Sequence, residues 1–275
     1  MHIKKAKSRL QTSLFCLLAL FCLCAICASF YQLFVWASDS QRTKAEITAI
    51  DAVSKPSERA DDAFVETIKP KVAPSNLYWQ YLTKRLIDVD FSALKKQNPD
   101  TAGWVQLLGT NINYPFVKTT DNDFYLFHSF SRARSTAGWV FADFRNRFDG
   151  YDKNIILYAH GRYDSTMFGT LRNILTSGWL NYPDNFLLRT ATPTENALWQ
   201  VFSVYHIPAT NDYIQTEFAR LDDFAAFAQK LKARSAHDFK TEVYGDDRIL
   251  TLSTCFDDRG ERVVLHAKLI KRSRR

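Results

Sequence analysis

The chain has 275 residues, of which 46% are hydrophobic and 14% aromatic, and this composition excludes an intrinsically disordered protein. Once the two ends are set aside, roughly 200 residues remain, which is enough for one domain with a sizeable core. The formal charge of +7 indicates either an anionic partner or a solvated basic surface, and part of that charge lies at the two tips of the chain.

Residues 10–38 carry no charged side chain, and the apolar core of this stretch spans residues 14–37. As a helix, its roughly 24 residues extend ~36 Å and cross a bilayer core of ~30 Å with some tilt. Basic residues precede it, so the positive-inside rule predicts a cytoplasmic tail at residues 1–13 and export of the rest. A cleaved signal peptide is the alternative, but its apolar region is shorter, about 7–15 residues. We therefore predict a retained transmembrane anchor, and an exported domain argues against a nucleic-acid partner.

The next segment, residues 38–76, is polar and interrupted by prolines, and we predict a stalk or linker there. Within it, residues 45–53 and 61–68 are candidates for short helices. The remaining residues, 77–275, are expected to form the main folded domain.

Period-two patterns after Gly103 predict many short strands, with a few helices between them. The predicted strands are residues 104–107, 112–117, 138–141, 154–160, 186–189, 198–205, 249–253 and 263–270. The predicted helices are residues 77–87, 91–97 capped by Asp90, 167–175 and 221–234. This pattern favours a mainly β fold, closed or nearly closed into a barrel.

Three predicted strand ends carry side chains that can act as a nucleophile, a proton carrier or a hydrogen-bond donor. The buried strand at residues 249–253 leads to Cys255, and a turn at residues 257–260 then leads to Arg262 at the start of the next strand. The strand from residue 154 ends on His160, directly before a glycine. We expect the three strand ends to present cysteine, histidine and arginine to one site.

The five cysteines are unevenly distributed, because four of them lie in the N-terminal apolar stretch and only Cys255 lies elsewhere. An exported domain with one cysteine cannot form an internal disulfide, so this thiol is a candidate nucleophile. The alternative is a small buried hydrophobic residue. The position of Cys255 at a strand end favours a functional role.

Other polar residues near these strand ends have weaker claims. Ser253 and Thr254 precede the thiol and are candidates for the substrate-binding groove. His266 lies inside a strand and is expected to be structural, whereas His128 is a candidate for the groove. A lone cysteine and scattered histidines lack the spacing of a zinc site, so we expect neither a metal nor another cofactor.

Residues 251–255, Thr-Leu-Ser-Thr-Cys, followed by Arg-Val-Val from residue 262, resemble the active-site signature of the sortases, class B in particular. Further segments are similar to class B sequences in the same order, so the resemblance covers about residues 77–271; they are residues 98–105, 110–115, 121–126 and 167–171. One position departs from the family: Gly161 follows His160 where the family usually has asparagine, so no role is carried over for that asparagine.

The resemblance implies a sortase-type eight-stranded β-barrel on the outer face of a Gram-positive membrane. Sortases are cysteine transpeptidases that cleave a sorting motif near the C-terminus of a secreted protein and join the new carboxyl group to an amine. The expected partners are therefore secreted proteins with a C-terminal sorting signal and a peptidoglycan cross-bridge or precursor amine, or a pilin lysine. The class B resemblance also suggests an Asn-Pro-x-Thr-x motif or a related pentapeptide.

The chemistry fits the three strand-end residues. We expect Cys255 to attack the carbonyl of the motif threonine, because a thiolate is the strong nucleophile that an amide requires. His160 is expected to transfer protons, and Arg262 to donate hydrogen bonds to the oxyanion. The alternatives are a hydrolase with the same residues, a pilin-polymerising sortase and a non-catalytic binding module.

Overall fold

In the computed structural model, the backbone is described for residues 2–59, 65–68, 72–73, 75–255 and 260–275. Side chains are described for the same residues except 2–13 and Cys255. The chain divides into two compact units, Met1–Arg42 and Thr43–Arg275. Most of the turn predicted at residues 257–260 lies outside the described residues.

The first unit is helical and apolar. Helix α1 (His2–Ser54) contains the span Leu14–Ser54, which is long and apolar enough to cross a membrane, with a mean hydropathy of 2.5 in its most apolar part. Its large apolar side chains are exposed, for example Phe15 at 72% and Phe34 at 72%. Length and composition therefore allow a membrane span, and a signal sequence shares these properties.

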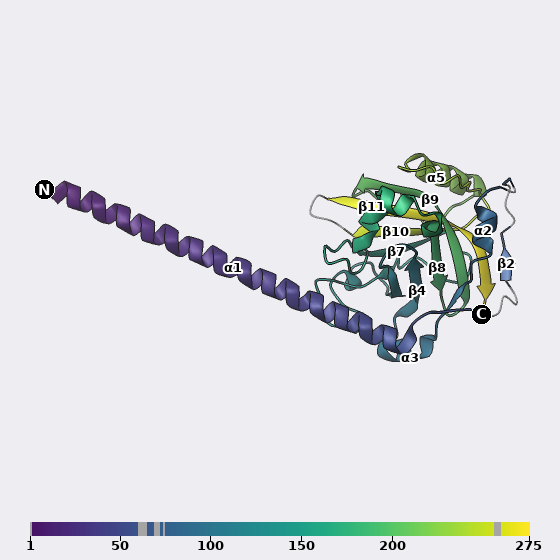
Figure 1. The fold of residues 1–275 in the computed structure, drawn as a ribbon, viewed down its shortest axis with the longest axis horizontal. Coiled ribbons are helices and arrows are strands. Elements are labelled where there is room, and N and C mark those ends of the chain that lie inside the picture. The colour runs from purple at the N-terminus through teal and green to yellow at the C-terminus, as the bar shows by residue number, and fades with distance from the viewer. Residues whose placement is uncertain (1, 60–64, 69–71, 74, 256–259) are drawn as a thin grey trace. The chain divides into compact units, whose positions relative to one another are not determined.

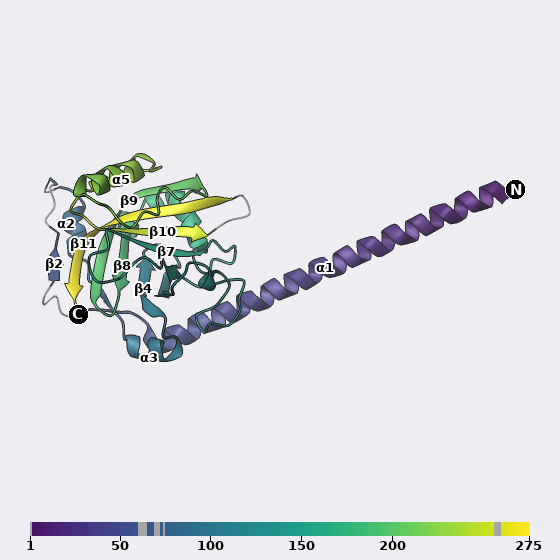
Figure 2. The same ribbon diagram turned by 180° about the vertical axis from the view of Figure 1, so that it is seen from behind.

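Eight strands of the second unit close into a barrel (Figures 1 and 2). They are β4 (Thr101–Leu107), β5 (Asn113–Val117), β6 (Phe141–Ala142), β7 (Asn154–His160), β8 (Leu187–Ala191), β9 (Glu195–Pro208), β10 (Ile249–Cys255) and β11 (Glu261–Arg274). Their order is β10-β7-β6-β5-β4-β8-β9-β11, and the pairing of β10 with β11 completes the ring. The fold class predicted from the sequence is confirmed.

Strands β7 and β10 are almost continuously apolar because both of their faces are covered. The apolar side chains of β7 belong to the barrel core cluster. Strand β10 also contributes Ile249 to a second cluster under helix α5 (Leu221–Ala233), which lies against the outside of the barrel (Figure 1). The buried side of α5 includes Phe224 and Leu231, which pack in one cluster with Ile249 and Val264. Parallel strands buried on both faces typically have such sequences.

The predicted helices are found with small differences. Helix α3 (Phe91–Gln97) begins after Asp90, whose carboxylate accepts a hydrogen bond from the Ser92 backbone N–H, as predicted for an N-cap. Helix α2 (Tyr78–Leu82) is shorter than predicted, because Ile87 pairs in the small ladder of β1 (Ser57–Glu58) and β3 (Ile87–Asp88). The short helices are η1 (Phe124–Leu126), η2 (Gly169–Leu175), α4 (Ser177–Leu180) and η3 (Pro183–Phe186).

The predicted stalk at residues 38–76 differs most from the structure. Helix α1 continues to Ser54 without a break, and Ile50 is only 2% exposed within the barrel core cluster. Where a helix was expected at residues 61–68, the described part is strand β2 (Val65–Thr67), which pairs with the end of β11. These sparse apolar residues pack on the barrel, so its compact unit begins at Thr43 rather than at residue 77.

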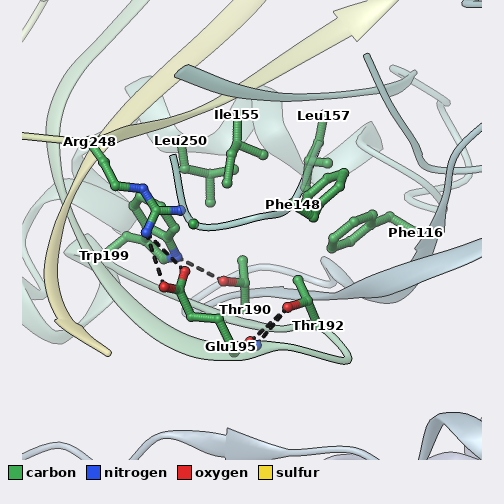
Figure 3. A pocket seen from close by; sticks show the side chains of 11 residues that line it. Phe116, Phe148, Ile155, Leu157, Thr190, Thr192, Glu195, Trp199, Arg248 and Leu250 are labelled. Atoms are coloured by element: carbon green, nitrogen blue, oxygen red, sulfur yellow. Dashed lines mark hydrogen bonds and ion pairs between the residues drawn. The ribbon is translucent and has the colours of Figure 1, made fainter. Parts of the chain in front are cut away.

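A small cavity inside the barrel lies where β7 and β10 begin (Figure 3). Arg248 and Glu195 form an ion pair beside it, with Nη1 and Oε2 3.0 Å apart and side chains only 10% and 12% exposed. Arg272 approaches the same carboxylate at 3.4 Å. This buried cluster closes one end of the barrel, and Cys255 and His160 terminate the same strands at the other end.

Candidate active site

The two residues expected to react are paired by the sheet register. Strands β7 and β10 run parallel, and Cys255 is aligned with His160 at their common C-terminal end. Neighbouring strands lie about 4.8 Å apart, so the backbone positions of the two residues are adjacent. The sequence could not show that these strands pair in this register, although it showed that both end on a reactive residue.

Arg262 reaches the same end of the barrel from the opposite direction. Strand β11 runs antiparallel to β10, with Ser253 aligned with Val264. Cys255 is two residues after Ser253 and Arg262 is two residues before Val264, so the antiparallel register leads both toward the same end. The structure therefore brings together the three strand ends that the sequence analysis selected.

The His160 ring is partly buried and held by a backbone group. Its Nε2 lies 2.9 Å from the carbonyl oxygen of Leu126. A carbonyl oxygen can only accept, so Nε2 carries a proton and Nδ1 is the basic atom of the neutral ring. Burial lowers the pKa of His160 below its ordinary value of 6.5; the bond to Leu126 raises it and the charge of Arg162 lowers it. The net effect favours a neutral imidazole at pH 7.

The position next to the Leu126 carbonyl, which accepts the hydrogen bond from His160, is occupied by a glycine, Gly138. Gly138 has a φ of +58°, and a Cβ at this position would lie 2.5 Å from the oxygen of Tyr125 and 2.8 Å from that of Leu126. Both distances are shorter than real Cβ contacts. Gly138 thus permits the backbone of residues 125–126 to lie where its carbonyl reaches the histidine.

The guanidinium of Arg262 is oriented by a buried tyrosine. Its Nη1 donates to the hydroxyl of Tyr213 at 3.0 Å, and that hydroxyl lies 2.9 Å from Oγ of Ser253. Tyr213 and Ser253 are both fully buried. The three side chains form one short network that begins two residues before the cysteine.

The structure places the two candidate groove residues in internal hydrogen bonds. Ser253 bonds to Tyr213, and the hydroxyl of Thr254, which is 5% exposed, accepts from the backbone N–H of Val263 at 2.8 Å. Both contacts tie β10 to elements around the site.

His266 and His128, the two other histidines singled out from the sequence, both make specific side-chain contacts. His266 is fully buried, with Nδ1 2.8 Å from Oγ1 of Thr251 and Nε2 2.7 Å from the hydroxyl of Tyr205. Burial lowers its pKa to about 3, so it is neutral and structural, as predicted. His128 stacks on Phe124 with ring centroids 3.9 Å apart, and its Nδ1 lies 2.7 Å from the carbonyl oxygen of Phe124.

Sequence reasoning missed Leu126, Gly138 and Tyr213. Leu126 acts through a backbone carbonyl, which no side chain identifies. Tyr213 lies 49 residues from Arg262 in the sequence, in a segment without periodicity. Within the described ranges, no three His, Cys, Asp or Glu side chains gather closely enough to hold a metal ion.

A closed eight-stranded barrel with cysteine, histidine and arginine converging at one end has the arrangement of a thiol-dependent acyl-transfer enzyme. No family model matches the chain. Among characterised proteins, it is 36% identical to sortase B of Listeria monocytogenes over 180 residues, which is 64% of this chain and 72% of that protein. Sortase B of Staphylococcus aureus is 36% identical over 184 residues, 66% of this chain and 75% of that protein.

Solved structures that resemble this chain also belong to sortase B proteins. A sortase B structure from Bacillus anthracis superposes with a TM-score of 0.68 at 29% identity, covering 85% of this chain and 99% of that one. A sortase B–substrate complex from Staphylococcus aureus gives a TM-score of 0.61 at 35% identity, covering 66% and 84%. The chain belongs to the sortase B family and is a cysteine transpeptidase.

Proposed function

We propose that this transpeptidase is anchored in the membrane and cleaves a C-terminal sorting motif of secreted proteins. It then joins the new carboxyl group of the cleaved protein to an amine of the cell wall. The observation that carries the proposal is the register pair of Cys255 and His160, with Arg262 approaching along β11. A sortase B of known structure has been crystallised with a substrate, which supports a peptide substrate of the same class here.

In the first half-reaction, the sulfur of Cys255 attacks the carbonyl carbon of the motif threonine, and the thiol proton passes to Nδ1 of His160. The tetrahedral intermediate then collapses as the C–N bond breaks, and the imidazolium returns its proton to the leaving amine. The product is a thioester between Cys255 and the threonine. The lowered pKa of His160 makes its protonated form a stronger acid toward the leaving amine.

In the second half-reaction, the acceptor amine attacks the thioester and loses a proton to His160, and the released thiolate recovers that proton. Arg262 donates hydrogen bonds to the oxyanion in both steps. Its guanidinium stays charged throughout, and the contact with Tyr213 holds one of its nitrogens in place. The side chain therefore loses less conformational freedom when it binds the oxyanion in the transition state.

The proposed topology places residues 1–13 in the cytoplasm, residues 14–37 in the membrane and the catalytic domain outside the cell. The basic flank before the apolar stretch supports this orientation by the positive-inside rule, and the exposed apolar surface of α1 supports a lipid environment. Cysteine labelling from either side of intact cells tests the orientation. In a Cys255→Ala background, a reagent that cannot cross the membrane should modify a cysteine placed at Tyr151, which is 72% exposed, and not one placed at Ser8.

The proposed acceptor is an amine of the peptidoglycan cross-bridge or its precursor. The test mixes the full chain in lipid nanodiscs with a panel of sorting-motif peptides, and mass spectrometry identifies the products with and without an added amine. We expect an amine adduct after the motif threonine that is absent with Cys255→Ala. Free acid alone, unchanged by any amine, would show a hydrolase instead. A panel of triglycine, diaminopimelate and a lysine-containing pilin peptide separates wall anchoring from pilus assembly.

A further inference from the structure

The last turns of helix α1 are part of the catalytic unit. Ile50 is 2% exposed in the core cluster, Thr43 is 3% exposed, and Ile47 packs against the same core. Residues 43–54 are therefore held on the barrel by apolar contacts, so the backbone positions of this part of the helix are fixed relative to the barrel.

Glu46 extends from these turns to the loop 127–137. Its Oε1 accepts a hydrogen bond from the backbone N–H of Ser131 at 2.6 Å and lies 3.2 Å from the hydroxyl of Ser129. Hydrogen bonds from N–H groups to a carboxylate are about twice as strong as those between neutral groups. Glu46 thus gives loop 127–137 a charged partner on the N-terminal helix.

Hydrogen bonds within loop 127–137 hold its two halves together, so a displacement at Ser131 is transmitted to the start of the loop at Phe127. The N–H of Ser129 donates to the carbonyl of Ala133 at 2.8 Å, and the N–H of Ser135 donates to that of Phe127 at 2.9 Å. The amide of Asn98 holds the carbonyl of Phe130 at 2.7 Å. These bonds make the loop a stiff unit rather than a flexible connection.

The base of this loop carries the group that orients the histidine. Leu126 directly precedes loop 127–137, and its carbonyl oxygen lies 2.9 Å from Nε2 of His160. Ser131 is only a few residues further along the same loop. A chain of fixed groups therefore runs from the N-terminal helix, through Glu46 and the loop, to the ring of His160.

We propose that Glu46 is a positioning residue for catalysis: it fastens loop 127–137 to the N-terminal helix and thereby holds the Leu126 carbonyl against His160. The proposal rests on the acid–base role of His160 given under Proposed function. It gives residues 43–54, which pack on the barrel, a consequence for catalysis as well.

Removal of the carboxylate should lower kcat and leave KM unchanged, because the imidazole would lose its fixed orientation while the substrate groove keeps its contacts. A small misplacement of a catalytic group costs up to about a hundredfold in rate, and for an indirect contact we expect about three- to tenfold. Glu46→Gln keeps an acceptor oxygen for the Ser131 N–H and should restore most of kcat.

The experiment compares full-length Glu46→Ala and Glu46→Gln with wild type in lipid nanodiscs, using a sorting-motif peptide and triglycine. Glu66→Ala is the matched control, since Glu66 is also a carboxylate of the N-terminal segment but pairs with Arg272 at the far end of β11, at 2.8 Å. A lower kcat with unchanged KM in Glu46→Ala, rescue by Glu46→Gln and a normal control would support the proposal.

Two results would overturn it. One is a kcat of Glu46→Ala equal to that of Glu66→Ala; the other is a loss that Glu46→Gln does not rescue, which would indicate a general structural defect. Cys255→Ala and His160→Ala are measured in the same series. If those two variants stayed active, the proposed catalytic roles would fail, whereas their inactivity beside a normal Glu46→Ala would reject the positioning role alone.

Discussion

Tyr213 and Arg262 meet through a single hydrogen bond, in which Nη1 of the arginine donates to the tyrosine hydroxyl at 3.0 Å. The tyrosine is fully buried, so this contact links the charge at the reaction end of the barrel to the loop between β9 and α5. Under the proposed mechanism, a guanidinium held in place stabilises the oxyanion more than a mobile one would.

Tyr213→Phe removes the hydroxyl that accepts a hydrogen bond from Nη1 of Arg262 and that lies against Oγ of Ser253. Hydrogen bonds to charged groups contribute about 1.5–3 kcal/mol, so we expect kcat/KM to fall roughly tenfold or more. Steady-state kinetics with a sorting-motif peptide measure the effect. The matched control is Tyr205→Phe, because the hydroxyl of Tyr205 bonds to His266 in the same buried cluster. Equal kinetic losses in both variants would argue against a specific role for Tyr213.

Gly138→Ala should slow the reaction without altering the residues that react. The added Cβ would lie 2.8 Å from the oxygen of Leu126, so the backbone must shift and His160 loses its acceptor. We expect a decrease in kcat of about tenfold or more. Gly150→Ala is a suitable comparison, because Gly150 also has a positive φ, +88°, but a Cβ added there would meet nothing within 4 Å. If Gly138→Ala and Gly150→Ala behave alike, backbone strain rather than the Leu126 contact explains the loss.

The buried histidine predicts a pH dependence of stability. The folded-state pKa of His266 is about 3, whereas an unfolded histidine titrates near 6.5. Between these values the unfolded state binds a proton that the folded state does not, so stability is full above pH 6.5 and falls as the pH drops toward 3. The slope is about 1.4 kcal/mol per pH unit for this group.

Urea unfolding at pH 7 and pH 5, followed by tryptophan fluorescence, measures this dependence. His266→Gln keeps a donor and an acceptor but cannot titrate, so it should lose less stability than wild type over the same interval. An identical pH dependence in the two proteins would show that His266 contributes nothing to it.

The ion pair in Figure 3 predicts a stability effect without a catalytic one. Glu195→Ala leaves Arg248 buried without its carboxylate partner, and breaking a buried pair in this way typically costs about 3–5 kcal/mol. Glu58→Ala breaks a pair with Arg189 at 3.3 Å in which the carboxylate is 55% exposed, so its expected cost is below about 1 kcal/mol. The two free energies of unfolding distinguish the cases. Comparable losses would contradict a structural role for the Glu195 cluster.

The sequence predicted those parts of the molecule that depend on local pattern. The strands ending on His160 and Cys255 are apolar runs of the right length, and the barrel follows from many such runs. The contacts of Tyr213 and Glu46 depend on the tertiary fold, because the residues they join are 49 and 85 positions apart in the sequence.

The N-terminal segment shows why composition can mislead. Half of residues 43–54 are polar, three of the rest are alanines, and the large apolar side chains that pack on the core are Ile47 and Ile50, so the segment has the composition of a spacer. The two apolar side chains lie one helical turn apart, and a single turn of periodicity does not distinguish a docked helix from a free one.

The proposed mechanism requires that Cys255 carries the acyl group and that His160 transfers its protons. The intact mass of the full-length enzyme, measured after a single turnover with a sorting-motif peptide and no amine, tests both roles. We expect a thioester adduct on Cys255 that triglycine discharges, no adduct in Cys255→Ala, and acylation slowed by about a hundredfold or more in His160→Ala. An adduct that persists in Cys255→Ala, or unchanged acylation in His160→Ala, would contradict the mechanism.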